Sequence, residues 1–332
     1  MTEIEIDSIL VTGGCGFIGS NFIRYILDTY QDIKITNLDK LTYAGNIENL
    51  KDMKNNDRYK FVRGDIKDKD IVDKCMENVD SVVHFAAESH VDRSILDASE
   101  FIKTNVLGTY ILLQSSLEKV NNGGNLRKFV MISTDEVYGS VPQDYSSKEE
   151  DTMLPRNPYS ASKAGADRLA YSYHETHGLP VVITRSSNNF GPYQNPEKLL
   201  PLAITNLVRD RKIPLYGDGK NIRDWLFVED NCKAVDMVLR CGKNGEVYNI
   251  GGGNEIENRS FIDLVLELMG KGPENIEFVE DRKGHDRRYS LDFSKIREEL
   301  GWQPSRDLRE NLEKTISWYN DNRSWWMELV KK

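Results

Sequence analysis

The chain has few cysteines, few histidines and no long apolar run. Its 332 residues include four cysteines, none of them in a C-x-x-C pair, and no group of cysteines and histidines has the spacing of metal ligands. We therefore expect reduced thiols, a cytoplasmic protein and no metal site. No segment reaches the roughly 20 apolar residues of a membrane-spanning helix. The first ten residues carry acids rather than the apolar stretch of a signal peptide, so we expect no membrane partner.

Basic residues are also scarce relative to acidic ones. The chain has 44 Lys and Arg against 53 Asp and Glu, which gives a formal net charge of −9. Because a nucleic-acid-binding surface needs a broad excess of positive charge to neutralise phosphates, we exclude nucleic acid as a partner. A small basic cluster could still hold a small anion. The length allows a large buried core and two domains or lobes.

The most informative motif present is a glycine-rich turn at residues 12–19, TGGCGFIG. Gly13, Gly16 and Gly19 have G-x-x-G-x-x-G spacing between an apolar run and a helical pattern, which is the context of a dinucleotide-binding turn. Glycine lets the backbone approach a pyrophosphate, and the helix N-terminus offers free N–H groups to that anion. Asp39 ends the next apolar run, where a carboxylate can bind a ribose 2′-hydroxyl and favours NAD over NADP. The alternative is a tight turn without a ligand.

Short apolar runs alternate with helical patterns over the first half of the chain. This alternation predicts an α/β fold, a Rossmann-type doubly wound parallel sheet with a smaller C-terminal substrate-binding lobe. Residues 1–189 are expected to form the NAD-binding domain, with 225–250 returning to it, and residues 190–224 and 251–332 to form the lobe. A long helical stretch is expected over 95–119. The expected strands are 9–12, 34–38, 60–63, 81–85, 129–133, 181–185 and 247–250.

Tyr159 and Lys163 form a Y-x-x-x-K pair. Residues four apart share one face of a helix, and this helix is expected to begin at Pro158 and to end at Gly178. A lysine beside a phenol lowers the pKa of the phenol. A phenolate next to a nicotinamide can take the proton of an alcohol as hydride leaves the carbon. The alternative is a chance pair on an amphipathic helix.

Two adjacent acids, Asp135 and Glu136, follow the expected strand 129–133 and Thr134. Oxidation of an alcohol needs no carboxyl pair. An elimination does, because one group removes a carbon-bound proton while another protonates the leaving hydroxyl. The alternative is an ordinary acidic cap on the next helix.

With these motifs in place, the chain resembles the extended short-chain dehydrogenases/reductases and, within them, the dTDP-glucose 4,6-dehydratases, over nearly its whole length. Cys15, Phe190 and Lys283 depart from the usual Ala, Tyr and Pro of that family, and none is at a catalytic position. The Asp135–Glu136 pair separates dehydratases from the related 4-epimerases. Another NDP-sugar dehydratase, a 4-epimerase or a non-catalytic NAD-binding protein are the alternatives. The resemblance is carried by residues 12–19, 39–46, 64–66, 84–92, 134–139, 159–163, 188–192, 223–225 and 281–289.

The resemblance implies dehydration of dTDP-glucose to dTDP-4-keto-6-deoxyglucose, a precursor of rhamnose-type deoxysugars, with tightly bound NAD. Tyr159, tuned by Lys163, takes the proton of the 4-hydroxyl as C4 is oxidised, and Thr134 hydrogen-bonds that oxygen. Glu136 removes the C5 proton, Asp135 protonates the leaving 6-hydroxyl, and hydride returns to C6. These roles require opposite protonation states, so we expect burial and the charge of Glu136 to keep Asp135 protonated.

The resemblance also implies the residues that bind each ligand. The preference for thymine over uracil as the base of the substrate rests on the resemblance alone, because no residue by itself indicates it. For the basic run at 281–289, which would bind the diphosphate, the alternative is a solvated loop. A homodimer through helices at 95–117 and 160–176 is implied as well. The implied NAD-binding residues are Gly13, Gly16, Phe17, Ile18, Gly19, Asp39, Lys40, Leu41, Thr42, Asp65, Ile66, Phe85, Ala86, Ala87, Glu88, Ser89, Thr104, Tyr159, Lys163 and Asn188. The implied substrate-binding residues are Ser89, Thr134, Asn189, Lys198, Leu199, Pro214, Tyr216, Arg223, Asn258, His285, Arg288 and Tyr289.

Overall fold

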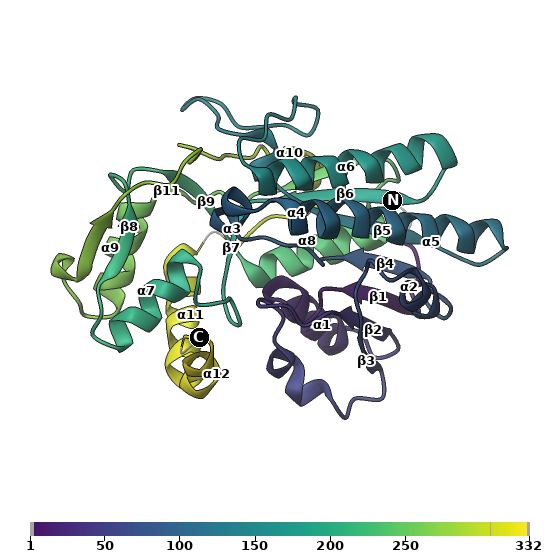
Figure 1. The fold of residues 1–332 in the computed structure, drawn as a ribbon, viewed down its shortest axis with the longest axis horizontal. Helices are drawn as coiled ribbons and strands as arrows, with labels where there is room; N and C mark the ends of the chain where they lie inside the picture. Colours follow the sequence, from purple (N-terminus) through teal and green to yellow (C-terminus); the bar gives the residue numbers. More distant parts are fainter. Residues whose placement is uncertain (1–2, 306, 331–332) are drawn as a thin grey trace.

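A seven-stranded parallel sheet forms the centre of the computed structural model, which describes residues 3–305 and 307–330 (Figure 1). The strand order is β10-β6-β5-β4-β1-β2-β3, and every neighbouring pair is parallel. The order reverses between β1 and β4, where ligands bind in doubly wound sheets. The predicted fold class is therefore confirmed. The strands are β1 (Ser8–Thr12), β2 (Lys34–Asp39), β3 (Tyr59–Arg63), β4 (Ser81–His84), β5 (Lys128–Thr134), β6 (Val181–Ser186) and β10 (Val247–Ile250).

Helices cover both faces of this sheet. Because alternate residues of a strand face opposite sides, β1 directs Ile9 and Val11 toward α1 (Phe17–Thr29) and α8 (Val228–Cys241). Leu10 instead packs in the core formed with α2 (Lys69–Met76), α5 (Thr109–Asn121) and α6 (Pro158–His177). Figure 1 shows α5 and α6 on the side of the sheet opposite α1. In the described part of the chain, every helix is too short or too polar to cross a bilayer.

The expected strands are confirmed to within one residue at each end, but the single helix expected over 95–119 is wrong. The chain forms α3 (Val91–Leu96), then α4 (Ser99–Phe101), the π-helical turn η2 (Ile102–Gly108) and α5. Asp97 is the reason for the break, because its backbone is extended and its carboxylate accepts hydrogen bonds from the N–H and hydroxyl of Ser99 at 2.8 and 2.9 Å. Such a residue begins a new helix rather than continuing the old one.

The second half of the chain builds a smaller core beside the large sheet. A three-stranded sheet, β11-β9-β7, and a two-stranded sheet, β12-β8, pack against helices there. Trp225 and Phe261 stack at its centre with ring centroids 3.8 Å apart. The elements are β7 (Asn188–Phe190), α7 (Leu199–Val208), β8 (Ile213–Tyr216), β9 (Ile222–Phe227), β11 (Glu255–Glu257), α9 (Asn258–Leu268), η4 (Pro273–Asn275), β12 (Ile276–Val279), α11 (Leu308–Asp321) and α12 (Arg323–Leu329).

The expected boundaries between domain and lobe, after residues 189 and 224, fall inside β7 and β9, which pair with each other in the small sheet. One later element, α10 (Ser294–Leu300), places Ile296 in the core of the large sheet instead. Residues 190–224 and most of 251–330 supply apolar side chains to the smaller core. The division into two units therefore stays a prediction, with β7 and β9 as the strands that join them.

Candidate active site

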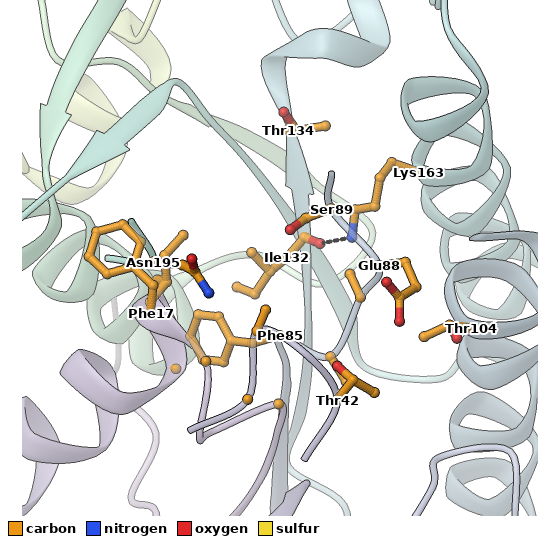
Figure 2. A pocket seen from close by; sticks show the side chains of 18 of the residues that line it. Phe17, Thr42, Phe85, Glu88, Ser89, Thr104, Ile132, Thr134, Lys163 and Asn195 are labelled. Carbon is orange, nitrogen blue, oxygen red and sulfur yellow. Dashed lines mark hydrogen bonds between the residues drawn. The ribbon is translucent and has the colours of Figure 1, made fainter. Parts of the chain in front are cut away.

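A cavity runs along the carboxyl ends of β1, β2, β4, β5 and β6 and extends to the segment before α7 (Figure 2). It is lined by the glycine turn, by the loops after the strands and by one face of α6. The predicted NAD-binding residues all line it, with the exception of Leu41, and so do the five predicted catalytic residues. Four predicted substrate-binding residues line it as well, namely Ser89, Thr134, Asn189 and Lys198.

The glycine turn is too tightly packed to accept side chains at two of its positions. A Cβ on Gly13, where φ is +71°, would lie 2.6 Å from the Cα of Ala86, and a Cβ on Gly19 would lie 2.5 Å from the carbonyl oxygen of Gly13. Gly16 caps the N-terminus of α1 without a side-chain hydrogen bond. The first N–H groups of α1 therefore remain available to an anion in the cavity.

Asp39 is the last residue of β2, and its carboxylate lies against the glycine turn. Its carboxylate accepts hydrogen bonds from the backbone N–H of Cys15 at 2.9 Å and of Leu41 at 2.7 Å. Burial raises the pKa of Asp39, and these two hydrogen bonds oppose the rise. Each oxygen keeps a lone pair for a further donor. Leu41 serves this site through its backbone, at φ 59°, and its side chain does not line the cavity.

Several buried polar atoms of the cavity wall have no hydrogen-bond partner. They are Ser133 Oγ, Asp135 Oδ2, Asn188 Oδ1, Asn189 Oδ1 and Gln194 Oε1. Buried polar groups are almost always hydrogen-bonded, so a cluster of unpaired ones points to a polar ligand. Together with the glycine cradle and Asp39, this wall fits a dinucleotide and a sugar.

Tyr159 and Lys163 lie on α6, whose ends are set by local chemistry. Asn157 and Ser160 form a capping box at its start, and Gly178 ends it in the left-handed conformation at φ 68°. The Lys163 ammonium donates to the carbonyl oxygen of Ile132 at 2.7 Å (Figure 2). Burial lowers the pKa of Lys163 to about 8, and the charge of Asp167 opposes that change.

The expected lowering of the pKa of Tyr159 by Lys163 does not set the net pKa of this phenol in the cavity. The pKa of Tyr159 is raised, first by burial and then by the negative charge of Glu136. A hydrogen bond with Thr134 acts in the opposite direction. The local Tyr–Lys pair is therefore outweighed by the carboxyl groups that the fold brings against the phenol.

Asp135 and Glu136 begin the short helix η3 (Asp135–Tyr138), which follows β5 directly. The Thr134 hydroxyl caps this helix, accepting from the N–H of Glu136 at 3.3 Å and donating to Asp135 Oδ1 at 3.2 Å. Asp135 is only 3% exposed. Its pKa lies well above the usual range because of burial, then the charges of Glu136 and Asp224. This is the direction that the expected protonated state requires. Glu136 is half-buried, and its carboxylate accepts from Asn157 Nδ2 at 3.3 Å.

Two predicted substrate-binding cations, Lys198 on the cavity wall and Arg223 outside it, are buried. Arg223 is buried with its guanidinium 4.3 Å from the centre of the Tyr289 ring, and burial lowers its pKa while Tyr289 and Glu136 oppose that change. Lys198 reaches the carbonyl oxygen of Ser89 at 3.2 Å, and burial lowers its pKa too. The residues not brought to the wall are Leu199, Pro214, Tyr216, Arg223, Asn258, His285, Arg288 and Tyr289.

Arg288 is fully engaged elsewhere. Its guanidinium pairs with Glu255 at 2.7 Å and donates to the carbonyl oxygens of Pro142 and Tyr145. The cavity also includes residues that the motifs did not indicate. Ser133 and Ser186 could have been found from their place at strand ends, whereas Gln194, Asn195 and Glu197 carry no signal in the sequence.

Comparisons with known proteins agree with this geometry. A family model described as GDP-mannose 4,6 dehydratase matches residues 10–315. A dTDP-glucose 4,6-dehydratase from Streptomyces antibioticus is 50% identical over 98% of this chain and 96% of that protein. The low-salt glycan biosynthesis protein Agl12 of Haloferax volcanii is 51% identical over 94% of this chain and 98% of that protein.

Solved structures show the same likeness. The dTDP-glucose 4,6-dehydratase DesIV of Streptomyces venezuelae, a double mutant crystallised with NAD and DAU bound, is 47% identical with a TM-score of 0.93, covering 97% of this chain and 99% of that one. A UDP-glucose 4-epimerase from Thermotoga maritima is 28% identical with a TM-score of 0.87, covering 95% and 99%. The epimerase thus shares the fold at much lower identity. By its sequence over nearly the full length and by its fold, this chain belongs to the dTDP-glucose 4,6-dehydratase family.

Proposed function

We propose that this chain dehydrates dTDP-glucose to dTDP-4-keto-6-deoxyglucose and retains NAD through the cycle. The observation that carries the proposal is the pair Asp135 and Glu136 in the same cavity as Tyr159 and Lys163. An epimerase would need only the second pair, whereas an elimination needs a base and an acid as well. The difference in burial between the two carboxyls supplies one of each.

NAD would be held by the glycine turn, by Asp39 and by the loops at residues 64–66 and 85–89, which line one continuous wall. When bound, NAD takes up hydride from C4 of the sugar and later returns it to C6. Because the hydride goes back to the same sugar, the reaction is redox-neutral. The cofactor therefore has no need to leave between turnovers.

The protons of the cycle are carried by the side chains. Tyr159 accepts the proton of the 4-hydroxyl as a phenolate. The raised pKa of this phenol opposes that form, and the positive charges of Lys163, one helical turn away, and of a bound nicotinamide would offset it. Glu136 removes the C5 proton, and Asp135 gives its proton to the 6-hydroxyl, which leaves as water. Glu136 then returns its proton to C5.

One turnover thus leaves Tyr159 with one proton more and Asp135 with one proton fewer. The Thr134 hydroxyl donates to Asp135 Oδ1 at 3.2 Å and lowers the pKa of Tyr159, so it is placed to pass the proton from Tyr159 to Asp135 and reset the site.

Positive charge for the diphosphate comes from Lys198, Arg223 and the loop at 281–289. Arg223 is a candidate because its guanidinium is buried and its terminal nitrogens bond neutral acceptors, with Nη1 donating to the carbonyl oxygen of Ile222 at 2.7 Å and Nη2 to that of Asp286 at 3.0 Å. We leave Arg288 out of the proposal because its donors are already used. Ser89, Asn189, Leu199, Pro214, Tyr216, Asn258, His285 and Tyr289 complete the proposed substrate site.

We also propose a cytoplasmic homodimer. The segment from α3 to α5 exposes large apolar side chains, namely Leu96, Ile102, Leu107 and Tyr110 at 86, 50, 45 and 42%. An exposed apolar group of this kind favours a protein interface. The four cysteines are free thiols, which is typical of a reducing compartment.

Incubation with nucleotide sugars tests the proposed function. dTDP-glucose, UDP-glucose and GDP-mannose are supplied in parallel, and products are identified by mass and by nuclear magnetic resonance. We expect a 4-keto-6-deoxy product from dTDP-glucose at the highest rate. A product of unchanged mass with inverted C4 would favour the epimerase, and no product from dTDP-glucose would refute the proposal.

A further inference from the structure

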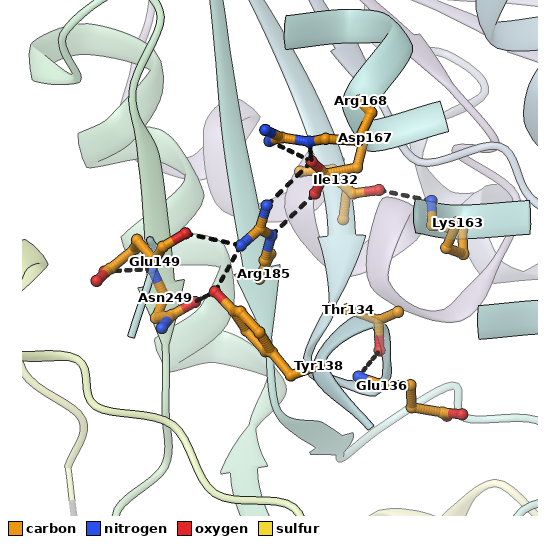
Figure 3. A network of polar contacts seen from close by, with 10 residues as sticks. All are labelled: Ile132, Thr134, Glu136, Tyr138, Glu149, Lys163, Asp167, Arg168, Arg185 and Asn249. Carbon is orange, nitrogen blue, oxygen red and sulfur yellow. Dashed lines mark hydrogen bonds and ion pairs between the residues drawn. The ribbon is translucent and has the colours of Figure 1, made fainter. Parts of the chain in front are cut away.

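A buried polar network lies behind the cavity wall, centred on Arg185 of β6 (Figure 3). Arg185 is 1% exposed. Its Nε and Nη2 donate to the Asp167 carboxylate at 2.9 and 3.1 Å. Its Nη1 donates to the Tyr138 hydroxyl at 2.6 Å and to the carbonyl oxygen of Glu149 at 3.0 Å. A buried ion pair is often no more stabilising than apolar residues of the same volume, so stability alone does not account for this arrangement.

The network connects the two elements that carry the proposed catalytic residues. Asp167 lies four residues after Lys163 on α6, so both share one face of that helix. Tyr138 is the last residue of η3, the short helix that begins with Asp135 and Glu136. Arg185 therefore bonds α6 through Nε and Nη2 and bonds η3 through Nη1. Figure 3 shows the guanidinium between Asp167 and Tyr138.

The same Tyr138 hydroxyl also ties η3 to a third element, β10. The Tyr138 hydroxyl donates to Asn249 Oδ1 of β10 at 2.9 Å. Burial raises the pKa of Tyr138 to about 12, so the hydroxyl stays a neutral donor. Burial also raises the pKa of Asp167, but the charge and hydrogen bonds of Arg185 outweigh it and leave that pKa lowered. Asp167 is thus a carboxylate that holds Arg185 in place.

We propose that Arg185 and Tyr138 are positioning residues that fix η3 against α6, so that Asp135 and Glu136 meet the sugar in register with Tyr159. This rests on the proposed function, because it assigns oxidation to α6 and elimination to η3. Neither residue lines the cavity. Their effect on the reaction passes through the placement of η3. A bidentate fork is suited to this task, since a lysine ammonium presents no such planar pair of donors.

The proposal predicts a specific kinetic defect in Tyr138→Phe. The ring stays, but the oxygen that ties Arg185 to Asn249 is lost. Oxidation at C4 is expected to keep its rate, because α6 and its hydrogen bond to Ile132 are unchanged. Elimination is expected to slow by about 10- to 100-fold, as a misplaced catalytic group does. In a single turnover with dTDP-glucose, the absorbance of reduced cofactor therefore accumulates, and deuterium at C5 slows the reaction more than in the wild type.

Tyr173→Phe is the matched control. Tyr173 is a buried tyrosine of α6, and its hydroxyl donates to Gln114 Oε1 at 3.1 Å, away from η3. The Tyr173→Phe variant also loses a phenol oxygen, and its rates of oxidation and of elimination are expected to keep the ratio seen in the wild type. Arg185→Lys is a second route to the same defect, because it keeps the positive charge and loses the fork. Thermal unfolding of each variant measures any loss of stability separately.

The outcomes separate the two proposals. Reduced cofactor that accumulates in Tyr138→Phe or Arg185→Lys, but not in Tyr173→Phe, supports the positioning role. Equal slowing of oxidation and elimination, or no slowing of either in a folded variant, would overturn it while an active wild type upholds the proposed function. A wild type that makes no keto sugar from dTDP-glucose would overturn both.

Discussion

Asp135→Asn is expected to gain stability relative to the wild type as pH rises, and to be nearly inactive. Asp135 is 3% exposed, its Oδ2 has no hydrogen-bond partner, and two further carboxyls lie near it. Its pKa is raised in the folded state, so the folded protein binds a proton that the unfolded chain has already released. The free energy of unfolding therefore falls as pH rises through the interval between the unfolded and the folded pKa, and it is restored below that interval.

The magnitude follows from the linkage. Each pH unit within that interval costs about 1.4 kcal/mol of stability. Asn carries no charge at any pH and so lacks this loss, although its buried amide without partners costs about 1–3 kcal/mol at every pH. From about pH 5 upward, the stability of the variant relative to the wild type is therefore expected to rise with pH, by at most about 1.4 kcal/mol per pH unit, until the pH passes the folded pKa of Asp135. Product formation is expected to drop at least about 100-fold because the general acid is lost.

Urea unfolding across this pH range, with NAD saturating in both proteins, measures the difference directly. The difference in the free energy of unfolding between variant and wild type is compared from one pH to the next. This comparison removes the contribution of every group that titrates alike in the two proteins. A stability difference that does not change with pH would show that Asp135 is ionised in the folded protein, and the reasoning on its protonation would fail.

Three other changes test separate parts of the site. Glu136→Gln is expected to reduce bound NAD with substrate yet release little product, and a single turnover without reduced cofactor would contradict the role of Glu136 at C5. Gly19→Ala would place a Cβ 2.5 Å from a carbonyl oxygen of the turn, so NAD content after purification should fall at least about tenfold, whereas Gly165→Ala, 3.5 Å from its nearest neighbour, should retain it. Leu107→Glu should shift the protein toward monomer in sedimentation, and Met327→Glu, at similar exposure, should not; equal behaviour would refute the proposed interface.

Features that depend on short stretches of sequence were predictable. The strands, the glycine turn with Asp39, and the α6 boundaries at Pro158 and Gly178 each follow from the chemistry of a few neighbouring residues. The break at Asp97 is also local in cause, but a polar residue within a helical pattern does not by itself announce that its side chain will cap the next turn.

Features that depend on contacts between distant residues were not. Arg185 and Tyr138 are 47 apart in the sequence, and nothing in either neighbourhood indicates that they will bond. The pKa of Tyr159 shows the same limit, because the pair with Lys163 is visible in the sequence while the burial and the carboxyl groups around the phenol are not. The local argument gave the right partner and the wrong sign.

The separation of roles between two covalently adjacent carboxyls has a simple structural origin. Thr134 is still extended, at φ −145° and ψ 153°, and η3 begins at the next residue. The chain changes direction between strand and helix there, which leaves Asp135 buried and Glu136 half-exposed to the cavity. The same threonine donates a hydrogen bond to Asp135 Oδ1 and lowers the pKa of Tyr159. In the proposed cycle, each turnover leaves Tyr159 with one proton more and Asp135 with one fewer. Thr134, which creates the difference between the two carboxyls, is therefore also the residue placed to restore it.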